Sequence, residues 1–134
     1  MKACVFCKIV EGKIPSHKIY EDKQALAFLD INPITEGHSL VVSKKHYNHF
    51  LEADERELAE LMKATKKVSE ALKKALNAQG INIGINIGRA AGQLVDHLHI
   101  HVIPRHGNDG LKSWEGKPIE NTEETLKKIK AVLG

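Results

Sequence analysis

Three histidines alternate with apolar residues late in the chain, where residues 97–103 read His-Leu-His-Ile-His-Val-Ile. Strand side chains point to opposite faces with a period of two, so this pattern predicts a strand with one apolar face and one row of imidazoles. On an extended strand, neighbours in the row of His97, His99 and His101 lie roughly 7 Å apart at Cα. The three rings can therefore converge on one small ligand.

A row of neutral imidazoles supports two different chemistries. Imidazole is the commonest side-chain metal ligand, and it is also a nucleophile or proton shuttle near neutral pH. A metal held by all three histidines would leave the amides of Gln93 and Asn86 and several cations without a role. Amide donors and cations suit a phosphate group on which charge develops, so a phosphate ligand is favoured. A three-histidine metalloenzyme stays open as the alternative. The cations are Lys44, Lys45, Arg89 and Arg105.

The two cysteines form a second candidate site. Cys4 and Cys7 are the only cysteines and have the Cys-x-x-Cys spacing. In a reducing compartment this spacing is more often a metal or redox site than a structural disulfide. A structural zinc site takes four protein ligands, so two more must come from residues distant in sequence. The alternative is a pair of buried free thiols.

Residue patterning also predicts the strands that must position these side chains. Short runs of apolar and β-branched residues, bounded by turn residues, indicate four strands besides the histidine strand. These strands are expected at residues 17–21, 25–29, 37–43 and 81–87. Because hairpin-linked strands are separate from the helices, the chain is expected to form an α+β domain on an antiparallel sheet.

Three helical segments are expected. A short helical turn is predicted within residues 4–11. From Asp54, apolar residues recur at helical spacing, Glu57 completes a capping box, and Gly80 is expected to close this long helix. Thr122 is expected to cap a final helix of about three turns.

Length and composition limit the number of domains and the classes of partner that the chain can have. The chain has 134 residues, enough for one domain with a core and too few for two ordinary ones, so residues 1–134 are expected to form a single domain. The formal net charge is +3 with both signs mixed along the chain, unlike the basic stripe of a nucleic-acid binder. Neither a membrane-spanning run nor a signal-peptide core is present, so a cytoplasmic protein without a membrane partner is expected.

Residues 97–103 resemble the motif of the histidine triad (HIT) family, His-φ-His-φ-His-φ-φ, in which φ is apolar. Other stretches resemble the family's remaining signature sequences in the same order: Ala27 to Pro33, Gly37 to Val42, Lys44 to His46, and Gly92 with Gln93. The resemblance implies a HIT-like antiparallel five-stranded sheet with one long helix and a C-terminal helix, pairing across a homodimer. It also implies that the segment around Trp114 approaches the partner's site.

The resemblance implies an activity as well. The protein is expected to be a nucleotide hydrolase or transferase that cleaves a phosphoanhydride or phosphoramidate bond at the α-phosphate of a nucleotide conjugate. The expected nucleotide is a purine nucleotide, that of adenosine, and no organic cofactor is expected. By this match His99 is the nucleophile that forms a covalent nucleotidyl-histidine, His101 holds a non-bridging phosphate oxygen, Gln93 contacts the phosphate or leaving atom, and Asn86 lies beside the phosphate. Leu94 is a departure, because well-known branches have at this position a serine or threonine that helps protonate the leaving group. The alternative is a nucleotide-binding regulatory or adaptor protein with little turnover.

A nucleoside pocket is implied by the same match. Phe6, Ile9, Phe28 and Ile31 correspond to apolar positions around the base, and Asp30 corresponds to the carboxylate that binds the ribose. Ordinary core packing is the alternative for the four apolar residues, and a turn or helix cap is the alternative for Asp30.

Zinc-containing relatives imply the two missing ligands of the cysteine site. By this match the structural zinc is held by Cys4, Cys7, His46 and His97, so His97 is not available as a nucleophile. The reserve candidates for the fourth ligand are His17, His49 and His106.

Overall fold

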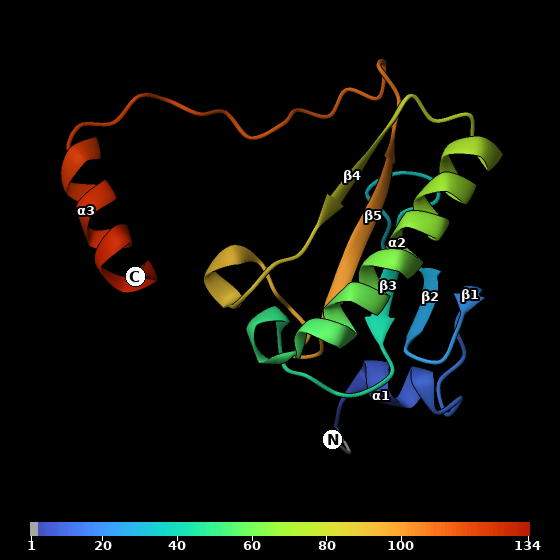
Figure 1. The fold of residues 1–134 in the computed structure, drawn as a ribbon. Helices are drawn as coiled ribbons and strands as arrows, with labels where there is room; N and C mark the ends of the chain where they lie inside the picture. The colour runs from blue at the N-terminus through green and yellow to red at the C-terminus, as the bar shows by residue number, and fades with distance from the viewer. Residues whose placement is uncertain (1–2) are drawn as a thin grey trace.

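The computed structural model describes residues 3–134 and is built on a five-stranded antiparallel sheet (Figure 1). The order across the sheet is β1-β2-β3-β5-β4, where the strands are β1 (Lys18–Glu21), β2 (Ala25–Leu29), β3 (Ser39–Ser43), β4 (Gly80–Gly84) and β5 (His99–Arg105). The α-helices are α1 (Val5–Val10), α2 (Glu55–Ala75) and α3 (Thr122–Leu133), and 3-10 turns lie at Phe50–Glu52 and Arg89–Ala91. The predicted α+β fold with an antiparallel five-stranded sheet is confirmed. Within residues 3–134, no helix has the length and apolar character needed to cross a membrane.

The two faces of the sheet carry different side chains. Opposite residues of an antiparallel pair point to the same face, and β3 pairs with β5 so that Val41 lies opposite Ile100 and Val42 opposite His99. The face with Val41 and Ile100 is covered by α2 and forms the main core (Figure 1). The other face carries His99 beside a smaller apolar cluster. Its buried members are Phe6, Leu26, Phe28, Leu40 and Val42.

The long helix begins where it was predicted and ends earlier. The carboxylate of Asp54 accepts a hydrogen bond from the Glu57 amide at 2.8 Å, which caps the first turn. The last helical residue is Ala75, and Asn77 turns the chain with φ of 55°. The prediction that Gly80 closes this helix is therefore wrong, since Gly80 is the first residue of β4. Asparagine tolerates the left-handed conformation, so the turn does not need glycine.

The histidine strand is shorter at its start than predicted. β5 begins at His99, and its pairing with β3 runs from His99 to Val102. His97 lies just before the strand in a turn, where its N–H donates to the carbonyl of Val95 at 2.9 Å. The prediction that one strand face carries all three imidazoles is therefore wrong for His97. The fourth strand is also shorter than predicted, because β4 ends at Gly84.

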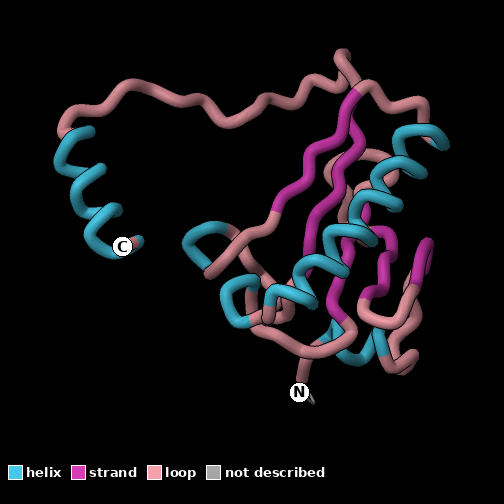
Figure 2. Tube along the Cα trace, viewed as in Figure 1, coloured by secondary structure: helices cyan, strands magenta, loops and turns pink. Residues whose placement is uncertain are grey.

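The C-terminal segment leaves the body of the protein. Residues up to Leu111 are still bonded to the body, since Arg105 donates to the carbonyl of Leu111. The chain beyond them runs away from the sheet, and α3 stands apart from it (Figures 1 and 2). The final helix is confirmed, but Thr122 is its first residue and not its cap; Asn121 precedes it with φ of 65°. All side chains of α3 are exposed, and Trp114 in the connecting segment is 96% exposed.

Candidate functional site

His99 is held in one tautomer by a main-chain carbonyl two residues before it. Its Nδ1–H donates to the main-chain carbonyl of His97 at 2.7 Å, because a carbonyl can only accept. The other ring nitrogen, Nε2, therefore carries a free lone pair. The side chain is buried, and burial lowers the pKa of His99 below 6.5, so the ring is neutral at pH 7. A neutral imidazole with a fixed, free Nε2 can act as a nucleophile.

His101 is held in the opposite tautomer through His38. The main-chain N–H of Ile34 donates to Nδ1 of His38 at 3.0 Å, which places the proton of His38 on Nε2. That Nε2–H donates to Nδ1 of His101, also at 3.0 Å, so His101 carries its own proton on Nε2. Burial and the nearby His99 and His38 lower the pKa of His101 to about 4. The site thus offers one acceptor nitrogen on His99 and one N–H donor on His101.

Sequence reasoning did not select His38, although it lies in the quoted stretch Gly37 to Val42. His38 directly precedes β3, which pairs with β5 in the sheet. A fourth histidine near the start of the predicted strand at residues 37–43 was the available signal. Its distance from His101 depends on the strand order, which a single sequence does not give.

Asp30 lies close to the same pair of rings. One carboxylate oxygen of Asp30 is 3.7 Å from Nε2 of His38, and the other accepts from the Asn32 amide at 2.8 Å in a turn. Asp30, His38 and His101 are near enough to one another to share a metal ion. The tautomer of His38 opposes this, because its Nε2 holds a proton and its Nδ1 accepts from the main chain. We therefore read His38 and His101 as a hydrogen-bonded pair, with one Asp30 oxygen left for a hydroxyl ligand.

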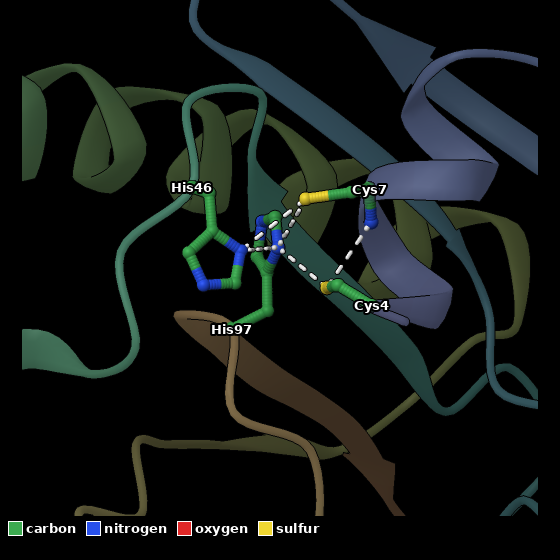
Figure 3. Close-up of side chains that lie close together, drawn as sticks. All are labelled: Cys4, Cys7, His46 and His97. Carbon is green, nitrogen blue, oxygen red and sulfur yellow. Dashed lines mark hydrogen bonds between the residues drawn. The ribbon is translucent and has the colours of Figure 1, made fainter. Parts of the chain in front are cut away.

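The predicted metal ligands come together in a separate cluster (Figure 3). Nδ1 of His97 lies 3.3 Å from Sγ of Cys4, 3.5 Å from Sγ of Cys7 and 3.2 Å from Nδ1 of His46. Tetrahedral zinc with bonds of about 2.0 to 2.3 Å places its ligand atoms roughly 3.3 to 3.8 Å apart. The distances in the cluster are close to this range, so the donor set fits zinc.

Hydrogen bonds fix both histidines of the cluster in the tautomer that a metal needs. Nε2–H of His97 donates to the carbonyl of Ser43 at 2.6 Å, and Nε2–H of His46 donates to Oδ1 of Asn48 at 3.0 Å. Each Nδ1 lone pair therefore faces the centre of the cluster. Burial and the adjacent Cys4 raise the pKa of Cys7 to about 11, and a bound cation would favour its thiolate.

The structure does not bring all three triad histidines to one metal ion. His97 faces the two cysteines, whereas Nδ1 of His99 is bonded to a carbonyl. The reserve ligands are also outside the cluster: His17 is exposed, His49 accepts from the Leu51 amide, and His106 lies against the carbonyl of Leu76.

The residues expected to bind the nucleotide lie on both sides of the histidines. Phe6 packs edge-on against Phe28 and against His99, with ring centroids 5.6 Å and 5.1 Å apart, and Ile9 contacts the same cluster. Ile31 lies outside the cluster and is 85% exposed. On the β4 side, a hollow of about 590 Å³ is lined by residues that include His101, Asn82, Asn86 and Trp114. Trp114 thus lines a hollow of its own chain.

Gln93 is buried, and its side chain is bonded to main-chain groups of the protein. It is only 3% exposed, and its Nε2 donates to the carbonyls of Asn48 and Val95 at 2.6 and 3.0 Å. Its Oε1 accepts from the Gly88 amide at 2.9 Å. Both amide hydrogens and the oxygen are therefore bonded to main-chain groups.

The family follows from a comparison with known domains, because the model of the HIT domain matches residues 11–108. The chain belongs to the HIT family. An uncharacterized HIT-like protein of Methanocaldococcus jannaschii is 51% identical over 129 residues, covering 95% of this chain and 98% of that protein. The crystal structure of a Streptococcus mutans protein superposes with a TM-score of 0.92 at 39% identity, covering 99% of this chain and 85% of that one.

Three other HIT relatives are named for an activity or a metal. An adenosine 5′-monophosphoramidase of Schizosaccharomyces pombe is 41% identical over 123 residues, covering 90% of each chain. An adenylylsulfatase of Arabidopsis thaliana is 39% identical over 125 residues, covering 93% of this chain and 62% of that protein. A zinc-bound histidine triad protein of Mycobacterium smegmatis superposes with a TM-score of 0.80 at 38% identity, covering 98% of this chain and 96% of that one.

Proposed function

We propose that this HIT protein cleaves adenosine monophosphate conjugates at the α-phosphate through a covalent nucleotidyl-His99. The observation that carries the proposal is the pair of opposite tautomers at the site. Nε2 of His99 is a free acceptor, and Nε2–H of His101 is a free donor beside it. A nucleophile and a neighbouring donor are what attack on an anionic phosphate requires. The activities named for the two hydrolase relatives support adenosine as the nucleoside.

The reaction would proceed in two displacements. In the first, the lone pair on Nε2 of His99 forms a bond to phosphorus, and the leaving group departs with the electron pair of its own bond. His101 donates to a non-bridging oxygen, and the carbonyl of His97 accepts from the imidazolium that forms on His99. In the second, water attacks phosphorus and releases a proton to the solvent, the phosphorus–nitrogen bond breaks, and its electrons return to Nε2. Water thus regenerates the neutral ring.

The residue after Gln93 affects which leaving groups can depart. The side chain of Leu94 is exposed and cannot donate a proton. Leaving groups that depart without added protons, such as a phosphate or sulfate, should therefore react better than amines. Dinucleoside polyphosphates, whose leaving group is a phosphate, are therefore among the candidate substrates.

The intact mass of the protein during turnover tests this function. With a panel of AMP conjugates, we expect a fraction of the protein to gain the mass of one adenylyl group on His99. The rate of its formation across the panel would rank the leaving groups. Tight AMP binding with neither adduct nor product would instead support the alternative, a nucleotide-binding regulatory or adaptor protein.

We also propose that zinc occupies the cluster of Cys4, Cys7, His46 and His97. The support is the arrangement of four donor atoms and the zinc-bound relative. Zinc here would supply a crosslink between the N-terminal segment, the chain after β3 and the chain before β5. All four ligands would come from the protein, which is typical of a structural site and leaves no position for a substrate.

A homodimer is expected from the same family membership. The exposed apolar residues Leu126, Ile129 and Val132 of α3 have no partner in the described part of the chain, and exposed apolar groups of this kind favour association. Light scattering at micromolar concentration should give twice the chain mass of 14.9 kDa. The mass of a single chain would contradict the prediction.

A further inference from the structure

We propose that Gln93 is a positioning residue that ties together the two loops beside the active site, and that it does not contact the phosphate. The inference deepens the proposed function, because it assigns a role to a residue at that site. Its side chain bridges the loop after β3, through the carbonyl of Asn48, and the loop before β5, through Gly88 and Val95.

The hydrogen bonds of Gln93 leave no N–H donor for a phosphate ligand. A primary amide has two N–H donors and one oxygen acceptor, and here the donors reach two carbonyls while the oxygen receives an N–H. To contact a phosphate, the buried amide would have to rotate away from the carbonyls of Asn48 and Val95. Both carbonyls would then lose a hydrogen bond from this buried side chain, which is unfavourable.

One end of this bridge reaches the four proposed metal ligands, here termed the metal cluster: Cys4, Cys7, His46 and His97. Asn48 supplies the carbonyl that Gln93 binds, and its side-chain oxygen accepts from Nε2–H of His46. Asn48 is held in turn by Glu52, which accepts from its side-chain amide and from its main-chain N–H. The position of Asn48 therefore affects the ring of His46.

The other end of the bridge reaches the nucleophile. The carbonyl of Val95 accepts from the side chain of Gln93 and from the main-chain N–H of His97. The carbonyl of His97 in turn accepts from Nδ1–H of His99. Gln93 thus helps to fix the turn whose last carbonyl sets the tautomer of His99.

Two substitutions separate a positioning role from a phosphate contact. Gln93→Met keeps a similar length and removes all three hydrogen bonds, and Gln93→Glu keeps the shape but presents no donors to the two carbonyls. Gln79→Glu is the matched control, because Gln79 uses its oxygen to accept from the Gly107 amide and a carboxylate can do the same. Hydrogen exchange of nucleotide-free protein is the main readout.

We expect the amides of residues 44–49 and 86–97 to exchange at least about tenfold faster in both Gln93 variants, since their local opening loses stabilising bonds. The control should match the unmodified protein. Release of bound metal to a chelator should accelerate in the same variants, and kcat should fall more than KM rises. Unchanged exchange in both loops would overturn the proposal, and weaker AMP binding by the same variants, measured by calorimetry, would then indicate a direct phosphate contact.

A measurement on the unmodified protein keeps the test valid if the variants fail to fold. The side-chain NH₂ resonances of Gln93 should exchange slowly and stay in place when AMP saturates the site. A large shift of these two resonances on AMP binding would overturn the positioning role. Neither readout requires turnover, so a protein without hydrolytic activity would refute the proposed function and leave this inference standing.

Discussion

Replacing His99 with alanine should abolish turnover while nucleotide binding stays within about tenfold, or roughly 1.4 kcal/mol. The reason is that Nε2 of His99 forms a bond only during the reaction, whereas the bound nucleotide is held mainly by other groups. The neighbouring donor on His101 remains, because its tautomer is set by His38. The measurement is kcat for an AMP conjugate, with the AMP affinity determined by calorimetry.

His17→Ala is the matched control for this change. His17 is an exposed histidine outside both sites, so its removal should leave turnover and binding unaltered. The intact mass of His99→Ala should also show no adenylyl adduct. Substantial hydrolysis by this variant, with normal AMP affinity, would mean that another group is the nucleophile.

Exchanging both Cys4 and Cys7 for serine should remove the bound metal and lower the thermal midpoint by on the order of 10 °C. A ligand present at 100 to 1,000 times its Kd stabilises the folded state by about 3 to 4 kcal/mol, and this contribution disappears with the thiolates. The loss should be largest at the N-terminus, because α1 carries Cys7 and follows Cys4 directly. Elemental analysis and calorimetry measure the two effects.

His49→Ala controls for the loss of a nearby histidine. His49 caps the 3-10 turn at Phe50–Glu52 and lies outside the metal cluster, so its removal should leave the zinc content unchanged. The zinc assignment itself fails if unmodified protein, purified without added metal and with reduced thiols, contains less than about a tenth of an equivalent.

Local patterns predicted most of the fold because their causes are local. The alternation of His99 with apolar neighbours indicates a strand, and Asp54 followed by Glu57 indicates the start of a helix; both are confirmed. The errors lie at the ends of helices and strands, where more than one residue could start the turn. Asn77 ends the long helix before Gly80, and a turn bond to Val95 takes His97 out of β5.

The candidate site depends on contacts between distant segments, which a single sequence shows only in part. The family resemblance selected the four metal ligands that the structure clusters. It could not show that carbonyls of Ser43 and His97 set the tautomers of His97 and His99. His38 was missed for the same reason, since its role follows from the pairing of β3 with β5 and from the amide of Ile34.

The metal cluster joins segments that are far apart in the sequence, which affects the order of folding. Its ligands are separated by 39 residues between Cys7 and His46 and by 93 residues between Cys4 and His97. Closing loops of this length loses chain entropy before the new contacts can compensate. His46 follows β3 and His97 precedes β5, so the two imidazoles meet only once these strands have paired. If zinc binds the four proposed ligands, the rate of zinc binding during refolding would therefore report when the N-terminal segment docks onto an assembled sheet.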